Sequence, residues 1–359
     1  MKKNLIFFLG TKAQFIKTIP IINEVDNNSY EVFLYDTCQH KSITQREIKK
    51  IKVDFKRIET SKNQFPAESI FELVLWFIKS FLLIFTKKLR FKDRKNSICF
   101  IHGNTLSTVL GIVWARKNNL KTIHIEGGYR SFNWFKPFPE EIIRYFSSKF
   151  SNYVVCFDDE SFANLSDMGI NGEIIQVARN TIYDQKYLTS LPTIHESKLT
   201  ISIHRNENIY NKKRLSETVN FLINIKRNYF EIANWYMHPQ TKKNLEKYNH
   251  IEKLNQAGIV TKELIEHEKF IKEIKTSKCV VTDGESVLEE SKIIGTPTYA
   301  LLNRLENKKS EGKNILISKY NHDQNISFFE NIEEYIADID REDNSTPSKE
   351  IIDFIKGVF

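Results

Sequence analysis

The feature that most constrains the fold is a repeated alternation of short apolar runs with longer stretches of helical pattern. Most of the runs are three to six residues long and apolar on both faces, as expected of parallel strands that helices cover on both sides. Alternation of this kind is typical of βαβ units. The runs fall into two series, so we predict an α/β protein with two Rossmann-like, doubly wound domains. The first series comprises 4–9, 30–35, 97–101, 122–125, 153–157 and 173–177, and the second comprises 199–203, 235–237, 259–260, 279–282, 298–302 and 315–317.

The length of 359 residues also favours two domains of ordinary size. The polar stretch 190–197 precedes the second series of strands, which places the domain boundary in this part of the chain. We predict an N-terminal Rossmann-like domain at 1–180, a C-terminal Rossmann-like domain at 181–345 and one amphipathic helix at 346–359.

The chain is basic, with a net charge of +8 and an isoelectric point of about 9.0. A basic chain can attract nucleic acid, anionic lipid or phosphorylated ligands. Most of the lysines are scattered over predicted helices, and the sequence has no RGG tract, RNP-type motif or zinc-finger spacing. We therefore expect no nucleic-acid partner.

The cysteines and the N-terminus indicate the compartment. Four cysteines lie far apart and none forms a CxxC pair, which fits reduced thiols and neither a disulfide framework nor a zinc site. The apolar run after Met1, Lys2 and Lys3 is too short for a signal peptide and has the pattern of a first strand. We expect a cytoplasmic protein without a metal site.

One predicted helix, at 70–85, is apolar on nearly every side, with only Glu72 and Lys79 as charged residues. At sixteen residues it is shorter than the roughly 20 apolar residues of a membrane span. One interpretation is a deeply buried or dimer-forming helix. The other is a peripheral contact of the segment 70–95 with the inner face of the cytoplasmic membrane, in which basic residues reach anionic headgroups. Those basic residues are Lys87, Lys88, Arg90, Lys92, Arg94 and Lys95.

Acidic and basic side chains gather in the segment that follows the apolar run 122–125. Glu126 comes first, a Gly-Gly turn follows, and Arg130, Glu140 and Arg144 lie downstream. An open α/β sheet places its binding and catalytic groups in such loops, after the carboxyl ends of its strands. The alternative is a solvated loop that leads into a helix beginning near Glu140.

Two other loops of the first half carry candidate binding groups. The loop at 10–17 opens a helix whose N–H groups and dipole favour an anion, and Lys12 and Lys17 add positive charge. After the strand at 97–101, small polar residues that include Asn104 suit the lining of a site. A helix N-cap by Asn104 or Thr105 explains the same residues, and both interpretations stay open.

In the second half, polar residues follow three predicted strands. His204 and Arg205 come after 199–203, and His238 comes after 235–237. The strand at 279–281 leads into Asp-Gly, polar residues and a Glu-Glu pair on the first helical turns, and then into Gly-Thr-Pro and another strand. This arrangement resembles the nucleotide-diphosphate half of two-domain sugar-nucleotide enzymes, in which helical N–H groups hold phosphate and a glutamate binds ribose. The residues concerned are Gly284, Glu285, Ser286 and Glu290.

Six motifs stand in one order along nearly the whole chain. They are Gly-Thr-Lys-Ala-Gln-Phe-Ile-Lys at 10–17, His-Gly-Asn-Thr at 102–105, Glu-Gly-Gly-Tyr-Arg at 126–130 with Pro-Phe-Pro-Glu-Glu at 137–141, Arg-Asn-Thr-Ile-Tyr-Asp at 179–184, His-Arg-Asn-Glu-Asn at 204–208 and Asp-Gly-Glu-Ser-Val-Leu-Glu-Glu at 283–290. This set resembles the non-hydrolysing UDP-N-acetylglucosamine 2-epimerases. The resemblance implies the GT-B arrangement, in which two Rossmann-like domains face each other across a cleft and the C-terminal helix packs back on the first. It also suggests a homodimer.

The resemblance implies a reaction as well. UDP leaves the sugar by anti elimination to give a 2-acetamidoglucal and then adds back with inverted configuration at C2, which supplies UDP-ManNAc-type sugars for surface polysaccharide. This chemistry needs a base for the C2 proton, an acid, and cations for the diphosphate. No cofactor or metal is implied. By matching position, the acid/base set would be Glu126, Glu140 and His204, and the residues that face UDP or substrate would be Lys17, Arg144, Arg205 and Glu290. We also expect substrate contacts from Lys12, Arg130, His238, Gly284, Glu285 and Ser286.

The sequence departs from the family pattern at several functional positions. Asn104 stands where the family has its catalytic aspartate, and an amide cannot take up a proton as a carboxylate does. Lys12 replaces an arginine and cannot form the same two-pronged contact. Further departures are Ile143 for asparagine, Arg179 for the hinge glycine, 284–286 for a Ser-Gly-Gly turn, and 305–309 for Thr-Glu-Arg-Pro-Glu. Nucleotide-sugar binding tolerates these changes better than epimerisation does.

Two further functions stay open beside the epimerase. The first is a GT-B glycosyltransferase with a UDP-sugar donor and a membrane lipid-linked acceptor, which needs only one general base. The apolar helix at 70–85, the basic charge and Asn104 favour it. The second is a nucleotide-sugar-binding regulator without activity. Because the motif order covers nearly the whole chain, we expect the epimerase.

Overall fold

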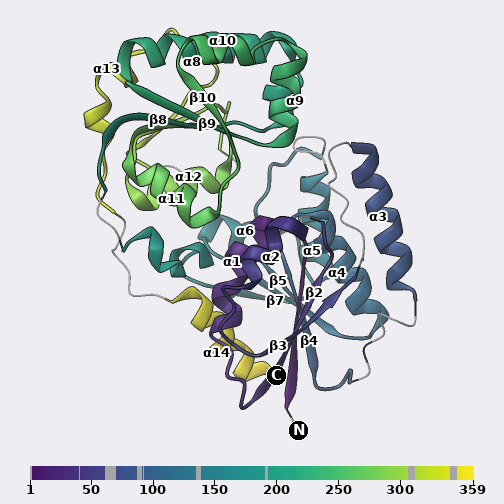
Figure 1. Cartoon of the computed structure of the whole chain (residues 1–359). Coiled ribbons are helices and arrows are strands. Elements are labelled where there is room, and N and C mark those ends of the chain that lie inside the picture. Colours follow the sequence, from purple (N-terminus) through teal and green to yellow (C-terminus); the bar gives the residue numbers. More distant parts are fainter. Residues whose placement is uncertain are drawn as a thin grey trace. The chain divides into compact units, whose positions relative to one another are not determined.

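The computed structural model describes residues 2–39, 41–60, 70–86, 91, 93–134, 139–190, 193–305, 312–339 and 346–359. Within these residues the chain forms two compact units, each built around one parallel sheet (Figure 1). The first unit comprises Met1–Asp184 and Ser345–Phe359, and the second comprises Gln185–Asn344. The boundary expected after residue 180 thus falls after Asp184. The predicted α/β class with two doubly wound domains is confirmed.

The sheet of the first unit places its site by its strand order, β3-β2-β1-β4-β5-β6-β7. The chain runs outward in one direction from β1 and in the other from β4, so the order reverses between these two strands. Ligands bind at such a switch point, beyond the carboxyl ends of the strands. The strands are β1 (Lys3–Leu9), β2 (Tyr30–Asp36), β3 (Phe55–Glu59), β4 (Ser97–His102), β5 (Lys121–Ile125), β6 (Tyr153–Cys156) and β7 (Glu173–Gln176).

Helices cover both faces of this sheet. Leu5 and Phe7 of β1 pack into one core with the helices α1 and α14, whereas Ile6 and Phe8 pack into the opposite core with α3 and α4. Because successive side chains of a strand face opposite sides, burial of both faces explains the unbroken apolar run. The helices are α1 (Lys12–Asn23), α2 (Lys41–Ile48), α3 (Ile70–Ile84), α4 (Leu106–Lys117), α5 (Glu140–Phe150), α6 (Asp159–Asp167) and α14 (Pro347–Val358), with the 3-10 turn η2 (Thr181–Asp184).

The sheet of the second unit has the strand order β10-β9-β8-β11-β12-β13, which reverses between β8 and β11. Its strands are β8 (Glu196–Ser202), β9 (Ile232–Met237), β10 (Ile259–Glu263), β11 (Ser277–Thr282), β12 (Thr298–Ala300) and β13 (Ile315–Ile317). Its helical segments are η3 (Lys186–Leu188), α7 (Asn206–Ile209), α8 (Lys212–Tyr229), α9 (Pro239–Lys247), α10 (Ile251–Gln256), α11 (His267–Thr276), α12 (Glu285–Ile294), α13 (Ser327–Glu330) and η5 (Ile332–Tyr335). Trp235, Leu222 and Tyr299 are fully buried at the centre of its core.

The apolar helix α3 is buried on one side only. Trp76 and Ile84 lie in the core beside α4, whereas Ile78 and Leu82 are exposed to 48% and 62%. None of the helices among the described residues is long and apolar enough to cross a bilayer. Of the basic cluster expected after this helix, Arg94 and Lys95 belong to the described residues, and Lys87, Lys88, Arg90 and Lys92 lie outside them.

Candidate active site

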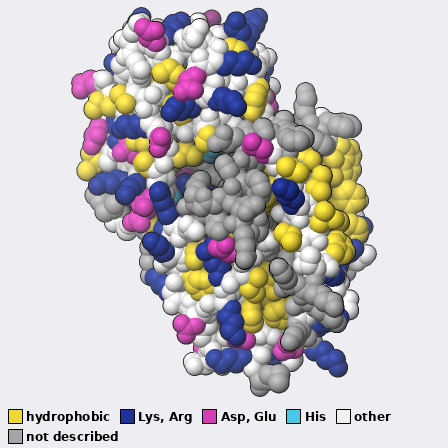
Figure 2. Space-filling view, turned by 45° about the vertical axis from the view of Figure 1, so that its right-hand side comes forward, with side chains coloured by type: hydrophobic (Ala, Val, Ile, Leu, Met, Phe, Trp, Pro, Cys, Tyr) yellow, Lys and Arg dark blue, Asp and Glu magenta, His cyan; other side chains and the backbone are white. Residues whose placement is uncertain are grey.

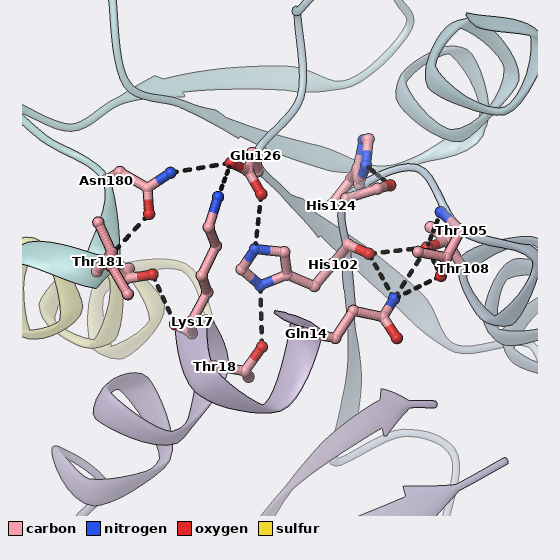
Figure 3. A network of polar contacts seen from close by, with 12 residues as sticks. Gln14, Lys17, Thr18, His102, Thr105, Thr108, His124, Glu126, Asn180 and Thr181 are labelled. Carbon is pink, nitrogen blue, oxygen red and sulfur yellow. Dashed lines mark hydrogen bonds and ion pairs between the residues drawn. The ribbon is translucent and has the colours of Figure 1, made fainter. Parts of the chain in front are cut away.

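Three loops meet at the switch point of the first unit. The loop after β1 begins α1, the loop after β4 carries His102 and Asn104, and the loop after β5 begins at Glu126. Because the parent strands are adjacent in the sheet, residues far apart in sequence come together here. Figure 3 shows Lys17 reaching from α1 toward one carboxylate oxygen of Glu126 and the His102 ring lying next to the other oxygen.

The carboxylate of Glu126 is held by three side chains. Its Oε1 accepts hydrogen bonds from Lys17 Nζ at 2.6 Å and from Asn180 Nδ2 at 2.9 Å. Its Oε2 lies 3.1 Å from His102 Nε2. The backbone of Glu126 has a φ of 66°, a left-handed conformation that is costly for a residue with a side chain. Strain of this kind persists where surrounding contacts enforce it, and it concentrates at functional sites.

Glu126 is ionised in this arrangement. Burial favours the neutral carboxyl, but the charge of Lys17 and the hydrogen bond from His102 outweigh it and hold the pKa of Glu126 well below its usual range. The side chain retains only 13% exposure, so the ion pair is shielded from water and salt. A carboxylate held in this way can stabilise positive charge on a bound ligand.

The His102 ring is neutral and oriented. It is only 2% exposed, and burial lowers its pKa, although the neighbouring Glu126 opposes that shift. A carboxylate only accepts, so Nε2 carries the hydrogen and Nδ1 accepts from the Thr18 hydroxyl at 2.9 Å. Thr18 and Lys17 both belong to α1, so one helix orients two of the three partners of Glu126, Lys17 directly and His102 through Thr18.

Gln14 joins the loops after β1 and β4. Its Oε1 accepts from the backbone N–H groups of Gly10 at 2.8 Å and Thr11 at 3.1 Å. Its Nε2 donates to the carbonyl oxygen of His102 at 2.7 Å and to Thr105 Oγ1 at 2.9 Å. The expectation that the backbone N–H groups of this loop are free to bind an anion is therefore wrong for Gly10 and Thr11, because both donate to the capping side chain of Gln14.

A second polar group lies at the start of α5. With its amide oriented so that the oxygen faces the guanidinium, Asn104 accepts from Arg144 Nε at 2.9 Å and Nη2 at 3.0 Å. The Oε2 atom of Glu140 is buried and has no hydrogen-bond partner among the described residues. A buried, unpartnered carboxylate oxygen is unusual and marks a group that is available to a ligand.

Glu141 and Arg130 form the structural pair of this segment. Arg130 Nε donates to Glu141 Oε1 at 2.6 Å, and the guanidinium lies over the rings of Phe132, Trp134 and Tyr145. Burial opposes ionisation of Glu141, but the N–H of Ser131 and the charge of Arg130 hold the pKa of Glu141 below its usual range. The segment after Gly128 is thus fastened to α5, and Nε of the predicted substrate ligand Arg130 is engaged within the protein.

In the second unit, the buried Asp283 organises the loop after β8. Its carboxylate accepts from the backbone N–H groups of His204 at 2.9 Å and Arg205 at 2.8 Å, and from Asn208 Nδ2 at 2.8 Å. Burial raises the pKa of Asp283, but contact with His204 and these hydrogen bonds lower it overall. His204 and Asp283 follow β8 and β11, the strands at the switch point.

The predicted ligand residues of the second unit surround this loop. The His204 ring stacks on His238 with centroids 4.5 Å apart, and Arg205 lies 3.7 Å from Glu285. Gly284 is the N-cap of α12, and a Cβ there would lie 2.9 Å from the His204 ring, so a side chain would displace the imidazole. Ser286 is exposed in the first turn of α12.

Glu290 lies further along α12 and is buried. Its Oε1 is 2.6 Å from His267 Nε2, and His267 Nδ1 is 2.6 Å from the hydroxyl of Tyr187. His267 and Tyr187 were not among the residues singled out from the sequence, nor were Gln14, Asn180 and Asp283. Gln14, Asn180 and Asp283 lie inside the motifs at 10–17, 179–184 and 283–290, and this was their only signal. Tyr187 and His267 lie in none of the six motifs.

The structure brings the candidates together within each unit. Glu126 and Asn104 lie on two loops of one switch point, with Lys17 on the adjoining helix α1 and Glu140 and Arg144 near the start of α5. His204, Arg205, His238 and α12 gather at the other switch point. Lys12 occupies the first position of α1, with its side chain partly exposed. Among the described residues, no group of histidine, cysteine and acidic side chains is arranged to hold a metal ion.

Comparison with known proteins identifies the family. The model of the family described as UDP-N-acetylglucosamine 2-epimerase matches residues 24–351. The UDP-N-acetylglucosamine 2-epimerase of Methanocaldococcus jannaschii is 27% identical over 335 residues, 88% of this chain and 88% of that protein. Its crystal structure with UDP-GlcNAc and UDP is 22% identical, covers 99% of this chain and 100% of that chain, and has a TM-score of 0.76. The Neisseria meningitidis enzyme bound to UDP-GlcNAc is 20% identical, covers 100% of both chains and has a TM-score of 0.77, so both structures share the fold. The chain belongs to the UDP-N-acetylglucosamine 2-epimerase family.

Proposed function

We propose that this chain is an epimerase that interconverts UDP-GlcNAc and UDP-ManNAc by eliminating UDP and adding it back. The observation that carries the proposal is the family match along 24–351, because it spans both units. The relative from Methanocaldococcus jannaschii bears the name of this activity. These matches do not favour the glycosyltransferase alternative. We assign the ManNAc-type product to surface polysaccharide biosynthesis.

We assign UDP to the second unit. The N–H groups in the first turn of α12, at Glu285 and Ser286, have the polarity that a diphosphate requires. Arg205 adds a guanidinium next to this turn, and Glu290 offers carboxylate oxygens to the ribose hydroxyls. His238 stacks on His204 and so helps to orient that ring.

We assign the charge and proton chemistry to Glu126, Glu140 and His204. Departure of UDP develops positive charge at C1 of the sugar, and the ionised Glu126 is suited to stabilise it. Removal of the C2 proton requires a base, and the buried, unpartnered oxygen of Glu140 is suited to accept it. His204, whose side chain is 36% exposed, is assigned to proton exchange with the departing or returning phosphate. Lys12, Lys17 and Arg144 supply cations toward the substrate.

The proposal is tested by proton NMR of UDP-GlcNAc incubated with the purified protein. We expect the signals of UDP-ManNAc to appear until the two epimers reach a constant ratio. Glu140→Gln keeps the size of the side chain and removes the base, so conversion should fall at least about 100-fold while UDP affinity, measured by calorimetry, is retained. The matched control is Glu173→Gln, on the exposed side chain of β7. A wild-type protein that binds UDP-GlcNAc without converting it would contradict the proposal.

We further propose that a second copy of the chain covers the exposed face of α3. Figure 2 shows hydrophobic side chains gathered on the side of the molecule that carries this helix. Exposed apolar patches of this kind mark interaction sites. The helix carries both Glu72 and Lys79, and this mixture of charge suits a self-complementary protein interface better than an anionic membrane. The stripe comprises Val74, Leu75, Ile78, Leu82 and Phe85, each between 37% and 62% exposed.

The oligomeric state tests this interface. The wild-type chain should be a dimer by light scattering coupled to gel filtration, and Leu82→Glu should make it a monomer because a charge would be buried in the contact. Ile194→Glu, at another exposed apolar residue, should leave the dimer intact. A wild-type monomer that sediments with phosphatidylglycerol vesicles would contradict the dimer and support the membrane alternative for this face.

A further inference from the structure

The second unit contains a hydrogen-bonded series of three side chains, of which only Glu290 has a role in the proposed function. Glu290 Oε1 and His267 Nε2 are 2.6 Å apart, and His267 Nδ1 and the hydroxyl of Tyr187 are also 2.6 Å apart. The side chains of His267 and Glu290 each retain 5% exposure. Both contacts therefore lie in a shielded region, where hydrogen bonds hold side chains firmly.

The chemistry of the three groups fixes the direction of this series. A carboxylate has no hydrogen to donate, so His267 Nε2 carries the hydrogen that Glu290 accepts. In the neutral imidazole, Nδ1 is then an acceptor and takes the hydrogen of the Tyr187 hydroxyl. The phenol thus selects the tautomer of His267 that can donate to Glu290. Only Oε1 takes part in this contact, which leaves Oε2 for a further donor.

The hydrogen bonds from Tyr187 through His267 to Glu290 connect the segment η3 to the helix α12. Tyr187 belongs to η3, the first element after the boundary at Asp184, and η3 packs against α11 and α12. His267 is the first residue of α11, and Glu290 lies in α12, whose N-terminus is assigned to the diphosphate. Any displacement of η3 is therefore passed to the side chain of Glu290 through two short hydrogen bonds.

We propose that Tyr187 and His267 are positioning residues that hold the carboxylate of Glu290 for the ribose hydroxyls of the nucleotide. Ribose binding by Glu290 then depends on the position of η3, the first element of the second unit. This inference rests on the proposed function, because it takes UDP as the ligand of the unit. It assigns the contact to the 2′ and 3′ hydroxyls and not to the phosphates.

The test compares UDP with 2′,3′-dideoxy-UDP by calorimetry. Tyr187→Phe removes one oxygen atom and leaves the ring, so the fold should be retained. We expect its Kd for UDP to rise about threefold to tenfold, the effect of one hydrogen bond. Its Kd for 2′,3′-dideoxy-UDP should equal that of the wild type, because the hydroxyls that Glu290 would bind are absent. A purely structural defect would weaken both ligands equally.

The unit offers a matched control. The hydroxyl of Tyr299 also lies next to a histidine, 3.0 Å from His322 Nδ1, but the His322 ring stacks on Phe221. Tyr299→Phe should leave both dissociation constants unchanged. His267→Gln, which keeps an N–H donor, should bind UDP more tightly than His267→Ala.

Three results would overturn the inference, and they are distinguishable. Equal UDP affinity in the wild type and Tyr187→Phe, or equal weakening for UDP and its dideoxy analogue, would refute the positioning role and leave the proposed function standing. A wild-type protein that binds no UDP would refute the assigned nucleotide site and the positioning role together.

Discussion

At the scale of single residues, the ion pair of Lys17 and Glu126 organises the first unit. These residues are 109 positions apart in the sequence, and no spacing rule connects them. The family resemblance selected both as candidates and expected Lys17 to face phosphate or substrate, and the structure shows its ammonium group on the carboxylate of Glu126. Pairing of this kind depends on which strands are neighbours in the sheet, so it becomes visible only when the strand order is known.

Asn104 stands at the position where the family resemblance expects a catalytic aspartate. Its amide holds the guanidinium of Arg144 but cannot carry a proton. Asn104→Asp should therefore keep the contact with Arg144 and add a group for proton transfer, and the epimerisation rate should rise at least about tenfold. The rate is measured by NMR at saturating UDP-GlcNAc. An unchanged or lower rate would show that proton transfer here does not use this position.

The buried His124 predicts how stability depends on pH. Burial lowers its pKa to about 4, so the folded chain favours the neutral ring. Because the folded value lies below the unfolded value of about 6.5, the stabilisation is fully present above pH 6.5 and is lost as the pH falls toward 4. The free energy of unfolding should fall by on the order of 3 kcal/mol across this window. Urea denaturation at several pH values measures it.

The matched variant for this prediction is His124→Gln. The wild-type ring uses Nε2 on the carbonyl of Gly103 at 2.9 Å and Nδ1 on the Ser148 hydroxyl at 3.2 Å, and a glutamine amide has both a donor and an acceptor but does not titrate. The variant should show a shallower pH dependence between pH 6.5 and 4. Identical slopes for the two proteins would refute the assignment to His124.

At the scale of secondary-structure elements, the sequence predicted most of the strands and their class. Buried central strands such as β1 and β4 have no polar face, and this pattern is strong enough to identify them. The edge strand β3 was not predicted, because it is mostly partly exposed and carries Lys56 and Arg57. The helix α3 was expected to be buried or to form an interface, and only its packing against α4 distinguishes its two sides.

At the start of α12, we expect a glycine substitution to affect UDP binding and not the stability of the fold. Gly284 has an ordinary φ of −93°, but a Cβ would lie 2.9 Å from the His204 ring. Gly284→Ala should therefore weaken UDP binding, by about tenfold, with little loss of stability. Gly169 is the opposite case, since its φ is +52° and a Cβ would meet nothing within 4 Å. Gly169→Ala should cost about 1 kcal/mol of stability and leave UDP binding unchanged.

Calorimetry and thermal denaturation of both glycine variants provide the comparison. If Gly284→Ala binds UDP as tightly as the wild type, the loop at His204 is not part of the nucleotide site. If Gly169→Ala also weakens UDP binding, a glycine substitution in the first unit, outside the His204 loop, has the same effect. The result for Gly284→Ala would then not place Gly284 in the nucleotide site.

At the scale of the whole molecule, the proposed reaction draws on residues of both units. We assign Glu126 and Glu140 of the first unit, and His204 and α12 of the second, to it. The segment between them is fastened at both ends, since Asn180 donates to Glu126 and Tyr187 contacts His267. The sequence predicted two doubly wound domains from hydrophobic pattern alone. These two contacts could not be predicted, because the motif at 179–184 does not reveal the partner of Asn180, and Tyr187 and His267 belong to no motif.

The measurement that tests the central claim most directly is incubation of the protein with UDP-GlcNAc in deuterated water, followed by proton NMR. Elimination removes the C2 proton of the sugar, and when UDP adds back, C2 must take up a proton that comes from solvent. We therefore predict loss of the C2 proton signal in recovered UDP-GlcNAc and deuterium at C2 of the UDP-ManNAc formed. Full retention of the C2 proton while the nucleotide sugar remains bound would contradict epimerisation by elimination and leave this chain as a nucleotide-sugar binder.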